Sequence, residues 1–295
     1  MRTSPGVPAS AHVTGFSSFV YGRTSIERTK NGVLSGESDA LLVRRLSDYI
    51  TGRKSAGGRV VLTLQEAAQR AAYEGVKGKR GAVVALDPRT GAVLAMVSTP
   101  SYDPSKLSSH DATFIRDYYR QLQDDKGDPL LNRAVSQTYP PGSTFKVITT
   151  AAALSTGGLS PDSRIPSPRE LTLPQTSKTL KNFGGESCGD GKTSTLSDAF
   201  RISCNTAFGQ IGLDLGKDKL RTQAQAFGLN DDSLQLAGRV ATSVFPTNLS
   251  PPQAAQSATA QYDARASTPP RPLVATRTPH GGDIPRPSPP RPPPA

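Results

Sequence analysis

Two valine-rich runs joined by a four-residue turn constrain the fold more than any other part of this sequence. Gly81-Ala-Val-Val-Ala-Leu-Asp87 and Ala92-Val-Leu-Ala-Met-Val-Ser98 flank the linker Pro88-Arg-Thr-Gly91. A linker with proline and glycine at these places is typical of a tight turn, and short valine-rich runs are typical of buried strands. We therefore predict an antiparallel hairpin at the centre of a sheet.

A second feature is the Pro140-Pro141-Gly142 turn, which leads into a predicted helix over 143–156. Ser143 is a favoured residue at a helix start and needs no further explanation. Lys146 is different, because the helix dipole disfavours a cation near the N-terminus. The i, i+3 spacing lets its amine reach the Ser143 hydroxyl, and burial would lower its proton affinity as a general base requires. These residues alone leave both readings open, a nucleophile with its base or only a helix start.

Ser203-Cys204-Asn205 lies between predicted helices at about 195–203 and 206–215. A serine hydroxyl can relay a proton and an asparagine amide can hold a peptide, but both side chains also cap helices. The two cysteines, Cys188 and Cys204, are too few for a disulfide scaffold and lack the spacing of metal ligands. They could form one bridge or remain two separate buried thiols. We predict no metal site and no cofactor.

Charge and hydropathy exclude several classes. The formal net charge is +11, but no dense Lys/Arg cluster is interleaved with aromatic residues, so we expect no nucleic-acid partner. No apolar run approaches the roughly 18 residues of a membrane span, and the first residues lack the apolar core of a secretory signal. We expect neither anchor nor signal within the printed chain. Nothing near the three scattered histidines supports a Ser-His-Asp triad.

The segment LNRAVSQTYPPGSTFK, residues 131–146, resembles the nucleophile segment of the class B penicillin-binding proteins, the serine D,D-transpeptidases of peptidoglycan synthesis. The hairpin GAVVALDPRTGAVLAMVSTPSYDP is similar to the one that precedes it in those proteins, and the actinobacterial members match best. The resemblance runs from about Val13 to about Arg265. It implies an α+β fold of the penicillin-binding-protein and β-lactamase kind, with an antiparallel sheet flanked by helices. It also implies a membrane-anchored, extracytoplasmic protein.

The resemblance also implies roles for particular residues. Ser143 would be the acylated nucleophile, Lys146 its base and Ser203 a proton relay. Asn205 would contact the donor peptide or the side chain of a β-lactam. The expected partners are peptidoglycan stem peptides and β-lactams, with proteins of the division or elongation machinery as further candidates. An extracytoplasmic location implies a bridge between Cys188 and Cys204 that positions Asn205.

The sequence departs from the family after Asn205, where no Lys-Thr-Gly or Lys-Ser-Gly follows. Half of the 26 prolines fall in the last 45 residues, a composition that cannot bury enough apolar surface to order a chain. We interpret the change near 258–268 as a frame change or truncation, and expect an incomplete, unstable domain of doubtful activity. The predicted segments are a remnant of the N-terminal pedestal (dimerisation) domain over 1–58, a partial transpeptidase domain over 59–258 and a disordered Pro/Arg-rich tail over 259–295.

Three functions therefore compete. The first is a D,D-transpeptidase that crosslinks stem peptides through an acyl-enzyme. The second is a non-catalytic fragment that binds penicillin or peptidoglycan. The third, a serine β-lactamase or β-lactam sensor domain, shares the serine-lysine spacing but is disfavoured by the hairpin and by the pedestal-like start of the chain.

Overall fold

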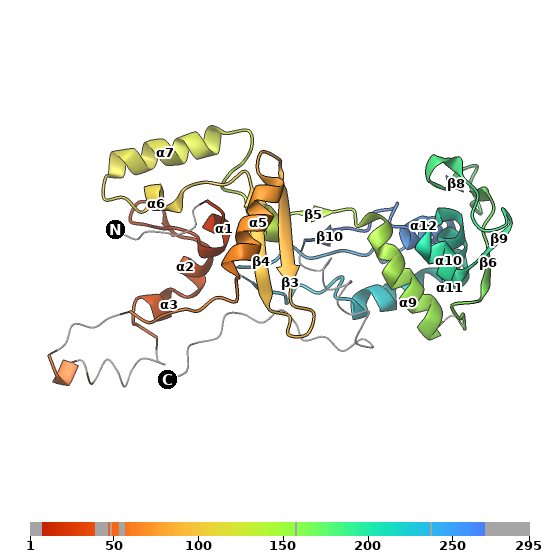
Figure 1. Ribbon diagram of the computed structural model, residues 1–295, viewed down its shortest axis with the longest axis horizontal. Coiled ribbons are helices and arrows are strands. Elements are labelled where there is room, and N and C mark those ends of the chain that lie inside the picture. Colours follow the sequence, from red (N-terminus) through yellow and green to blue (C-terminus); the bar gives the residue numbers. More distant parts are fainter. Residues whose placement is uncertain are drawn as a thin grey trace. The chain divides into compact units, whose positions relative to one another are not determined.

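The computed structural model describes residues 8–38, 47, 49–52, 57–156, 158–236 and 238–268 (Figure 1). They group into two compact units, which do not coincide with the three predicted segments. Of the described residues, unit 1 holds those between 8 and 137 together with 234–240. Unit 2 holds those between 138 and 233 together with 241–268.

The predicted hairpin is confirmed and belongs to unit 1. Strands β3 (Gly81–Leu86) and β4 (Val93–Thr99) pair antiparallel, with Val83 opposite Val97. Strand β4 is largely buried, whereas β3 is half-buried along its whole length. Helix α5 (Glu66–Val76) packs against β4, as Figure 1 shows. The hairpin and its helix thus form one layer of the core of unit 1.

Helix α5 begins later than its sequence suggested. We expect Thr63 to cap this helix, with Glu66 as its capping-box partner, but the helix starts at Glu66 itself. The Thr63 hydroxyl instead donates to the carbonyl of Val93, 2.7 Å away. The apolar run Arg59-Val-Val-Leu-Thr63 also predicts a strand, but no strand forms there. Both predictions were wrong, because Thr63 bonds to β4 instead.

The alanines of α5 predict a buried apolar stripe on this helix, but its buried residue is a glutamine. The Gln69 side chain is 4% exposed, donates to the carbonyls of Ala9 and Met96, and accepts from the Met96 amide. A buried amide is tolerated where its polar atoms are paired in this way. Gln69 therefore joins the N-terminal segment to β4.

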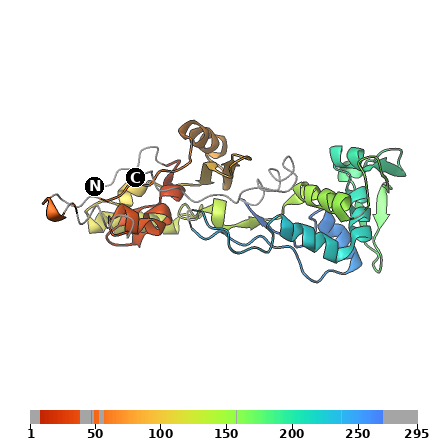
Figure 2. The same cartoon turned by 90° about the horizontal axis from the view of Figure 1, so that it is seen from below.

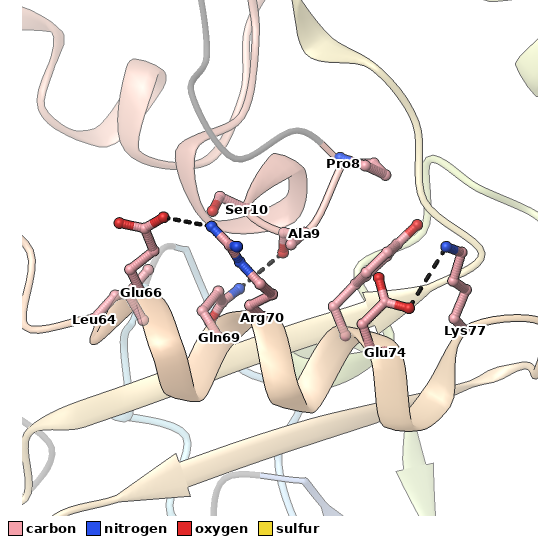
Figure 3. Close-up of a pocket in the computed structure, with 10 residues that line it drawn as sticks. Pro8, Ala9, Ser10, Leu64, Glu66, Gln69, Arg70, Glu74 and Lys77 are labelled. Carbon is pink, nitrogen blue, oxygen red and sulfur yellow. Dashed lines mark hydrogen bonds and ion pairs between the residues drawn. The ribbon is translucent and has the colours of Figure 1, made fainter.

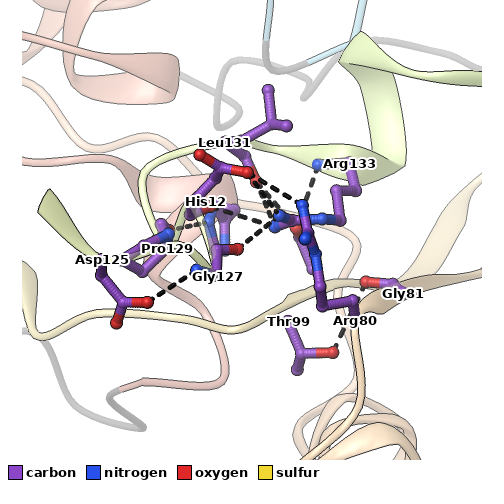
Figure 4. Close-up of polar contacts among 11 residues, drawn as sticks. His12, Arg80, Gly81, Thr99, Asp125, Gly127, Pro129, Leu131 and Arg133 are labelled. Atoms are coloured by element: carbon purple, nitrogen blue, oxygen red, sulfur yellow. Dashed lines mark hydrogen bonds and ion pairs between the residues drawn. The ribbon is translucent and has the colours of Figure 1, made fainter. Parts of the chain in front are cut away.

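A second buried polar cluster orders the loop that follows α7. The Arg133 side chain is 1% exposed and donates to the carbonyls of Gly127, Asp128 and Leu131 (Figure 4). Its guanidinium also lies 3.6 Å from the Asp128 carboxylate. The buried His12 ring donates from Nε2 to the Pro129 carbonyl at 2.8 Å. Sequence reasoning assigned no role to either residue.

The remaining helices and strands of unit 1 are short, apart from α7, which corresponds to the helix predicted near 111–123. Asp111 caps α7 by accepting from the amides of Thr113 and Phe114. The helix predicted over 40–50 lies mostly outside the described residues. The other elements are α1 (Ala11–Thr14), β1 (Ser17–Ser18), β2 (Gly22–Arg23), α2 (Ser25–Thr29), α3 (Asn31–Leu34), α6 (Pro104–Leu107), α7 (Ala112–Asp124) and α8 (Arg133–Ser136).

Three helices form the core of unit 2: α9 (Lys146–Thr156), α11 (Asn205–Ala226) and α12 (Pro251–Ala258). They lie side by side in Figures 1 and 2, with α11 against both of the others. Close packing needs Gly212, because a Cβ there would come within 2.6 Å of the Ala258 Cβ. Gly216 has a φ of 71°, which interrupts α11 directly after the end of the predicted helix over 206–215.

Residues 259–268, assigned to the tail by composition, are part of unit 2. Ala266 pairs with Tyr139 and Ser267 with Thr138, and the side chains of Ala260, Ala264 and Ala266 are buried. The remainder of the predicted tail, 269–295, lies outside the described residues. The other elements of unit 2 are β5 (Thr138–Tyr139), η2 (Gly142–Phe145), β6 (Arg164–Pro166), β7 (Glu170–Thr172), β8 (Thr179–Lys181), η3 (Phe183–Gly185), β9 (Thr193–Thr195), α10 (Leu196–Arg201) and β10 (Ala266–Ser267).

Candidate active site

The starts of α9 and α11 bring three of the four predicted catalytic or binding residues into contact. Lys146 is the first residue of α9, and its side chain is 2% exposed. Its Nζ donates to the Ser203 carbonyl at 2.6 Å, the Ser203 Oγ at 2.9 Å and the Asn205 Oδ1 at 2.7 Å. A lysine ammonium has three N–H donors, so these acceptors satisfy the protonated form completely.

Burial makes Lys146 a weaker base than an ordinary lysine. Removal of the ammonium from water lowers the pKa of Lys146 from 10.5 to about 8. The Nζ also lies 5.5 Å from the centre of the Phe208 ring, an apolar neighbour on one side. With that pKa, roughly a tenth of the amine is neutral at pH 7. A neutral fraction of this size suits a general base that works near neutral pH.

Ser143 lies one turn before Lys146, inside η2, and its side chain is exposed. The turn follows Pro141, and Gly142 adopts a φ of 60°, a left-handed conformation that glycine adopts without strain. Ser143 therefore lies within the turn rather than at its cap. The three hydrogen bonds of Lys146 go to Ser203 and Asn205, so Ser143 has no share in them.

Ser203 has an unusual backbone conformation that serves these contacts. Its φ of 60° is uncommon for a serine and costs of the order of 1–3 kcal/mol, so it persists only because the surrounding contacts enforce it. In this conformation both its carbonyl and its hydroxyl reach the Lys146 Nζ. The residue that follows, Cys204, forms a disulfide with Cys188, with the two Cα atoms 6.2 Å apart. This separation falls in the usual range for a disulfide.

The amide of Asn205 is held in one orientation. Its Nδ2 donates to the Lys181 carbonyl at 3.1 Å, and its Oδ1 accepts from Lys146. Because an ammonium only donates, the oxygen must face Lys146 and the nitrogen must face Lys181. Sequence reasoning missed Lys181, because β8 precedes Asn205 by more than twenty residues and no motif marks its carbonyl.

A cavity elsewhere among the described residues lacks such a cluster of unsatisfied or reactive side chains. A cavity of about 800 Å³ lies in unit 1, beside α5 (Figure 3), and is lined by Gln69, Arg70, Glu74 and Lys77 among others. Its charged side chains pair with one another, Arg70 with Glu66 and Lys77 with Glu74. Within the described ranges, no group of His, Cys, Asp and Glu could hold a metal ion. In the same part of the chain, no helix is both long and apolar enough to cross a membrane.

Comparison with known protein families finds two matches. Residues 81–262 match the penicillin binding protein transpeptidase domain. Residues 1–60 match the penicillin binding protein A dimerisation domain.

Individual relatives point to the same family as these two matches. The peptidoglycan D,D-transpeptidase PbpA of Mycolicibacterium smegmatis is 50% identical over 235 residues, which cover 78% of this chain and 48% of the relative. The crystal structure of PBPA from Mycobacterium tuberculosis superposes with a TM-score of 0.89 at 39% identity, over 94% of this chain and 64% of that one. The penicillin G acyl-enzyme complex of penicillin-binding protein A from the same organism gives 0.87 at 40% identity, over 91% and 63% of the two chains.

This chain spans about half the length of the PbpA relatives it matches. The hairpin, the Ser143–Lys146 turn and the Ser203–Asn205 loop all lie within the matched range. Its fold is the α+β transpeptidase fold that the sequence resemblance predicted. The chain belongs to the penicillin-binding protein transpeptidase family.

Proposed function

We propose that unit 2 carries the acylating residues of a serine D,D-transpeptidase. Ser143 is the nucleophile, Lys146 the general base, Ser203 the proton relay, and Asn205 the residue that holds the acyl donor. The observation that carries the proposal is the buried Lys146, whose pKa is lowered to about 8 and whose Nζ contacts Ser203 and Asn205 one turn after an exposed serine.

Acylation starts from the neutral amine of Lys146. The amine takes the proton of the Ser143 hydroxyl while Oγ attacks the penultimate D-alanine carbonyl of a stem peptide. Backbone N–H groups at the start of the helix, that of Ser143 among them, stabilise the oxyanion of the tetrahedral intermediate. The carbon–nitrogen bond then breaks, and the leaving D-alanine nitrogen receives the proton from Lys146 through the Ser203 hydroxyl. The product is an ester on Ser143, with Lys146 neutral again.

The second half-reaction reverses the proton flow. An amine of a second stem peptide attacks the ester carbonyl and loses a proton to Lys146 through Ser203. The carbon–oxygen bond breaks, Ser143 Oγ regains its proton from Lys146, and a new amide crosslinks the two peptides. A β-lactam resembles the D-Ala-D-Ala end of the donor, so it acylates Ser143 but leaves an ester that resists this second attack.

Two further findings support the proposal. The relatives that match this chain carry the name peptidoglycan D,D-transpeptidase, and a solved relative is an acyl-enzyme with penicillin G. The Cys188–Cys204 disulfide fits an oxidising compartment, so we also propose an extracytoplasmic location for this part of the chain. The residues after Asn205 contain no Lys-Thr-Gly or Lys-Ser-Gly, so the proposal covers the acylating residues only.

A fluorescent penicillin tests the proposal directly. We expect covalent labelling of the purified chain, a mass increase on the peptide that contains Ser143, and no label on Ser143→Ala. Ser155→Ala, which changes an exposed serine on α9, the helix that begins at Lys146, is the matched control and should label normally. The labelling rate should rise about tenfold per pH unit up to about pH 8 and then level off, following the neutral fraction of Lys146.

Other outcomes separate the alternatives. Label that persists on Ser143→Ala contradicts the assignment of the nucleophile. A folded chain that binds penicillin without covalent label supports the non-catalytic fragment. Label that forms and is lost within seconds supports a serine β-lactamase.

A further inference from the structure

The start of α11 is capped by a residue from another segment. Cys204 holds the N-cap position of this helix, but its side chain makes no capping hydrogen bond. Asn182, which follows β8, supplies the missing acceptor: its Oδ1 lies 3.1 Å from the Thr206 amide nitrogen. We propose that Asn182 is a positioning residue of the acylating site, which holds the start of α11 so that Ser203 and Asn205 face Lys146. This inference rests on the proposed function of that site.

Asn182 makes contacts on both sides of its amide. Its Oδ1 accepts from Thr206, and its Nδ2 donates to the Glu186 carbonyl at 2.9 Å. Thr206 is fully buried, so its amide would otherwise lack a partner at a helix start, where the first N–H groups have no intrahelical acceptor. The side chain thus ties the end of β8 to the first turn of α11.

The neighbour of Asn182 completes the connection to the site. The Lys181 carbonyl accepts from Asn205 Nδ2, which leaves Asn205 Oδ1 directed at Lys146. Lys181 and Asn182 therefore hold consecutive residues of α11, Asn205 and Thr206. If the end of β8 moves away from α11, Asn205 loses the contact that orients its amide, and Lys146 loses one of its three acceptors.

The disulfide acts on the same loop in a different way. Cys204 Sγ lies 3.7 Å from Asn182 Oδ1, but a disulfide sulfur carries no proton, so this is a packing contact. The bridge limits how far Cys204 can move from Cys188. It does not orient the amides and carbonyls on either side of Cys204. Asn182, rather than the disulfide, orients the start of the helix.

The matched control is Asn132, which makes the same pair of contacts in unit 1. Its Oδ1 accepts from the Ala134 amide at the start of α8, and its Nδ2 donates to the His12 carbonyl. Asn182→Ala and Asn132→Ala each remove one helix cap, and each should cost about 1 kcal/mol of stability. Only Asn182→Ala removes a hydrogen bond to the helix start that contacts Lys146.

The experiment measures the pKa of Lys146 by carbon-13 NMR of labelled lysine side chains, with Lys146→Arg to assign the signal. In Asn182→Ala we expect water to replace Asn205 Oδ1 as an acceptor of the ammonium and to hydrate it. The pKa should then rise from about 8 towards 10.5, by at least about one unit, because its lowering comes from burial. Penicillin labelling at pH 7 should slow about tenfold or more, with its pH midpoint moved upward by the same amount. Asn132→Ala should leave both the pKa and the midpoint unchanged.

An unchanged Lys146 pKa in folded Asn182→Ala overturns the proposal, as does an equal shift in Asn132→Ala. If Asn182→Ala does not fold, Asn182→Leu supplies the measurement, because leucine has a similar side-chain volume but can make neither of the two hydrogen bonds. There too a raised pKa supports the proposal and an unchanged one overturns it. The titration needs no acylation. A chain that never labels therefore contradicts the proposed function, whereas the pKa of Lys146 still decides the role of Asn182.

Discussion

Among the described residues, unit 1 buries the cation Arg133 and unit 2 the cation Lys146, and the two are held in different ways. Arg133 in unit 1 donates to three backbone carbonyls of a single loop and lies near the Asp128 carboxylate. Lys146 in unit 2 donates to one carbonyl and two side-chain oxygens at the start of α11. The first arrangement organises a loop, and the second places a titratable amine among polar side chains.

The chemistry of the two side chains explains the difference. A guanidinium keeps its charge at any ordinary pH and presents five donors in a rigid fork, which suits a permanent clamp on carbonyls. An amine on a flexible chain loses its proton when burial lowers its pKa, as happens at Lys146. Of these two buried cations, only Lys146 can become neutral near pH 7 and act as a base.

The largest effect should follow loss of the amine. Lys146→Met should slow penicillin labelling of Ser143 by about a hundredfold or more, because general-base catalysis contributes about 10²–10⁴. The oxygens of Ser203 and Asn205 lose their donor in this variant, so the free energy of unfolding should also fall by about 1–3 kcal/mol, and labelling is compared per folded molecule. Labelling kinetics and urea unfolding on the same samples check both parts.

Lys219→Met is the control for that experiment, since Lys219 is exposed and donates only to the Thr156 carbonyl. It should label at the parental rate. A Lys146→Met variant that labels as fast as Lys219→Met would show that Lys146 is not the general base. Lys146 and Arg133 would then no longer differ in function.

Arg133→Met should show the opposite pattern. Several buried carbonyls lose their donor, and the free energy of unfolding should fall by about 3–5 kcal/mol. In Arg133→Lys, which keeps the charge but loses the forked guanidinium, the free energy of unfolding should fall by less. Urea unfolding measures the loss, while labelling per folded molecule should remain near the parental rate. A strong loss of labelling with unchanged stability would show that Arg133 is not a structural clamp.

The smallest effect is a pH dependence of stability that comes from His12, whose ring contacts the loop held by Arg133. Burial lowers the pKa of His12 from 6.5 to about 4, so the folded state keeps the ring neutral. Between these values the unfolded chain binds the proton and the folded chain does not. Stability should therefore fall as the pH drops from 6.5 towards 4, by up to roughly 3 kcal/mol from this group.

Urea unfolding at pH 7 and at pH 4.5 measures that loss. His12→Gln keeps an amide that can donate to the Pro129 carbonyl but does not titrate, and its stability should depend less on pH in this range. An equal acid loss in both proteins would assign the effect to other groups.

Local patterns predicted much of the fold. The valine-rich runs and the Pro-Arg-Thr-Gly linker predicted the β3–β4 hairpin, because strands and tight turns depend on neighbouring residues. Gly157 and Gly158 predicted the end of α9 for the same reason. The start of α5 was placed too early, since Thr63 had a better partner in β4 than the capping box offered. Composition did not reveal that Ala266 and Ser267 pair with β5.

The sequence by itself determined the hairpin, the Ser143–Lys146 turn, the Ser203-Cys204-Asn205 loop and the family that unites them. Only the tertiary structure decided that Lys146 contacts Ser203 and Asn205, that Asn182 caps α11, and that Arg133 and His12 are buried. The reason is physical. Spacing along a chain sets which residues share a turn of helix, whereas burial and hydrogen-bond partners depend on segments that meet only when the chain folds.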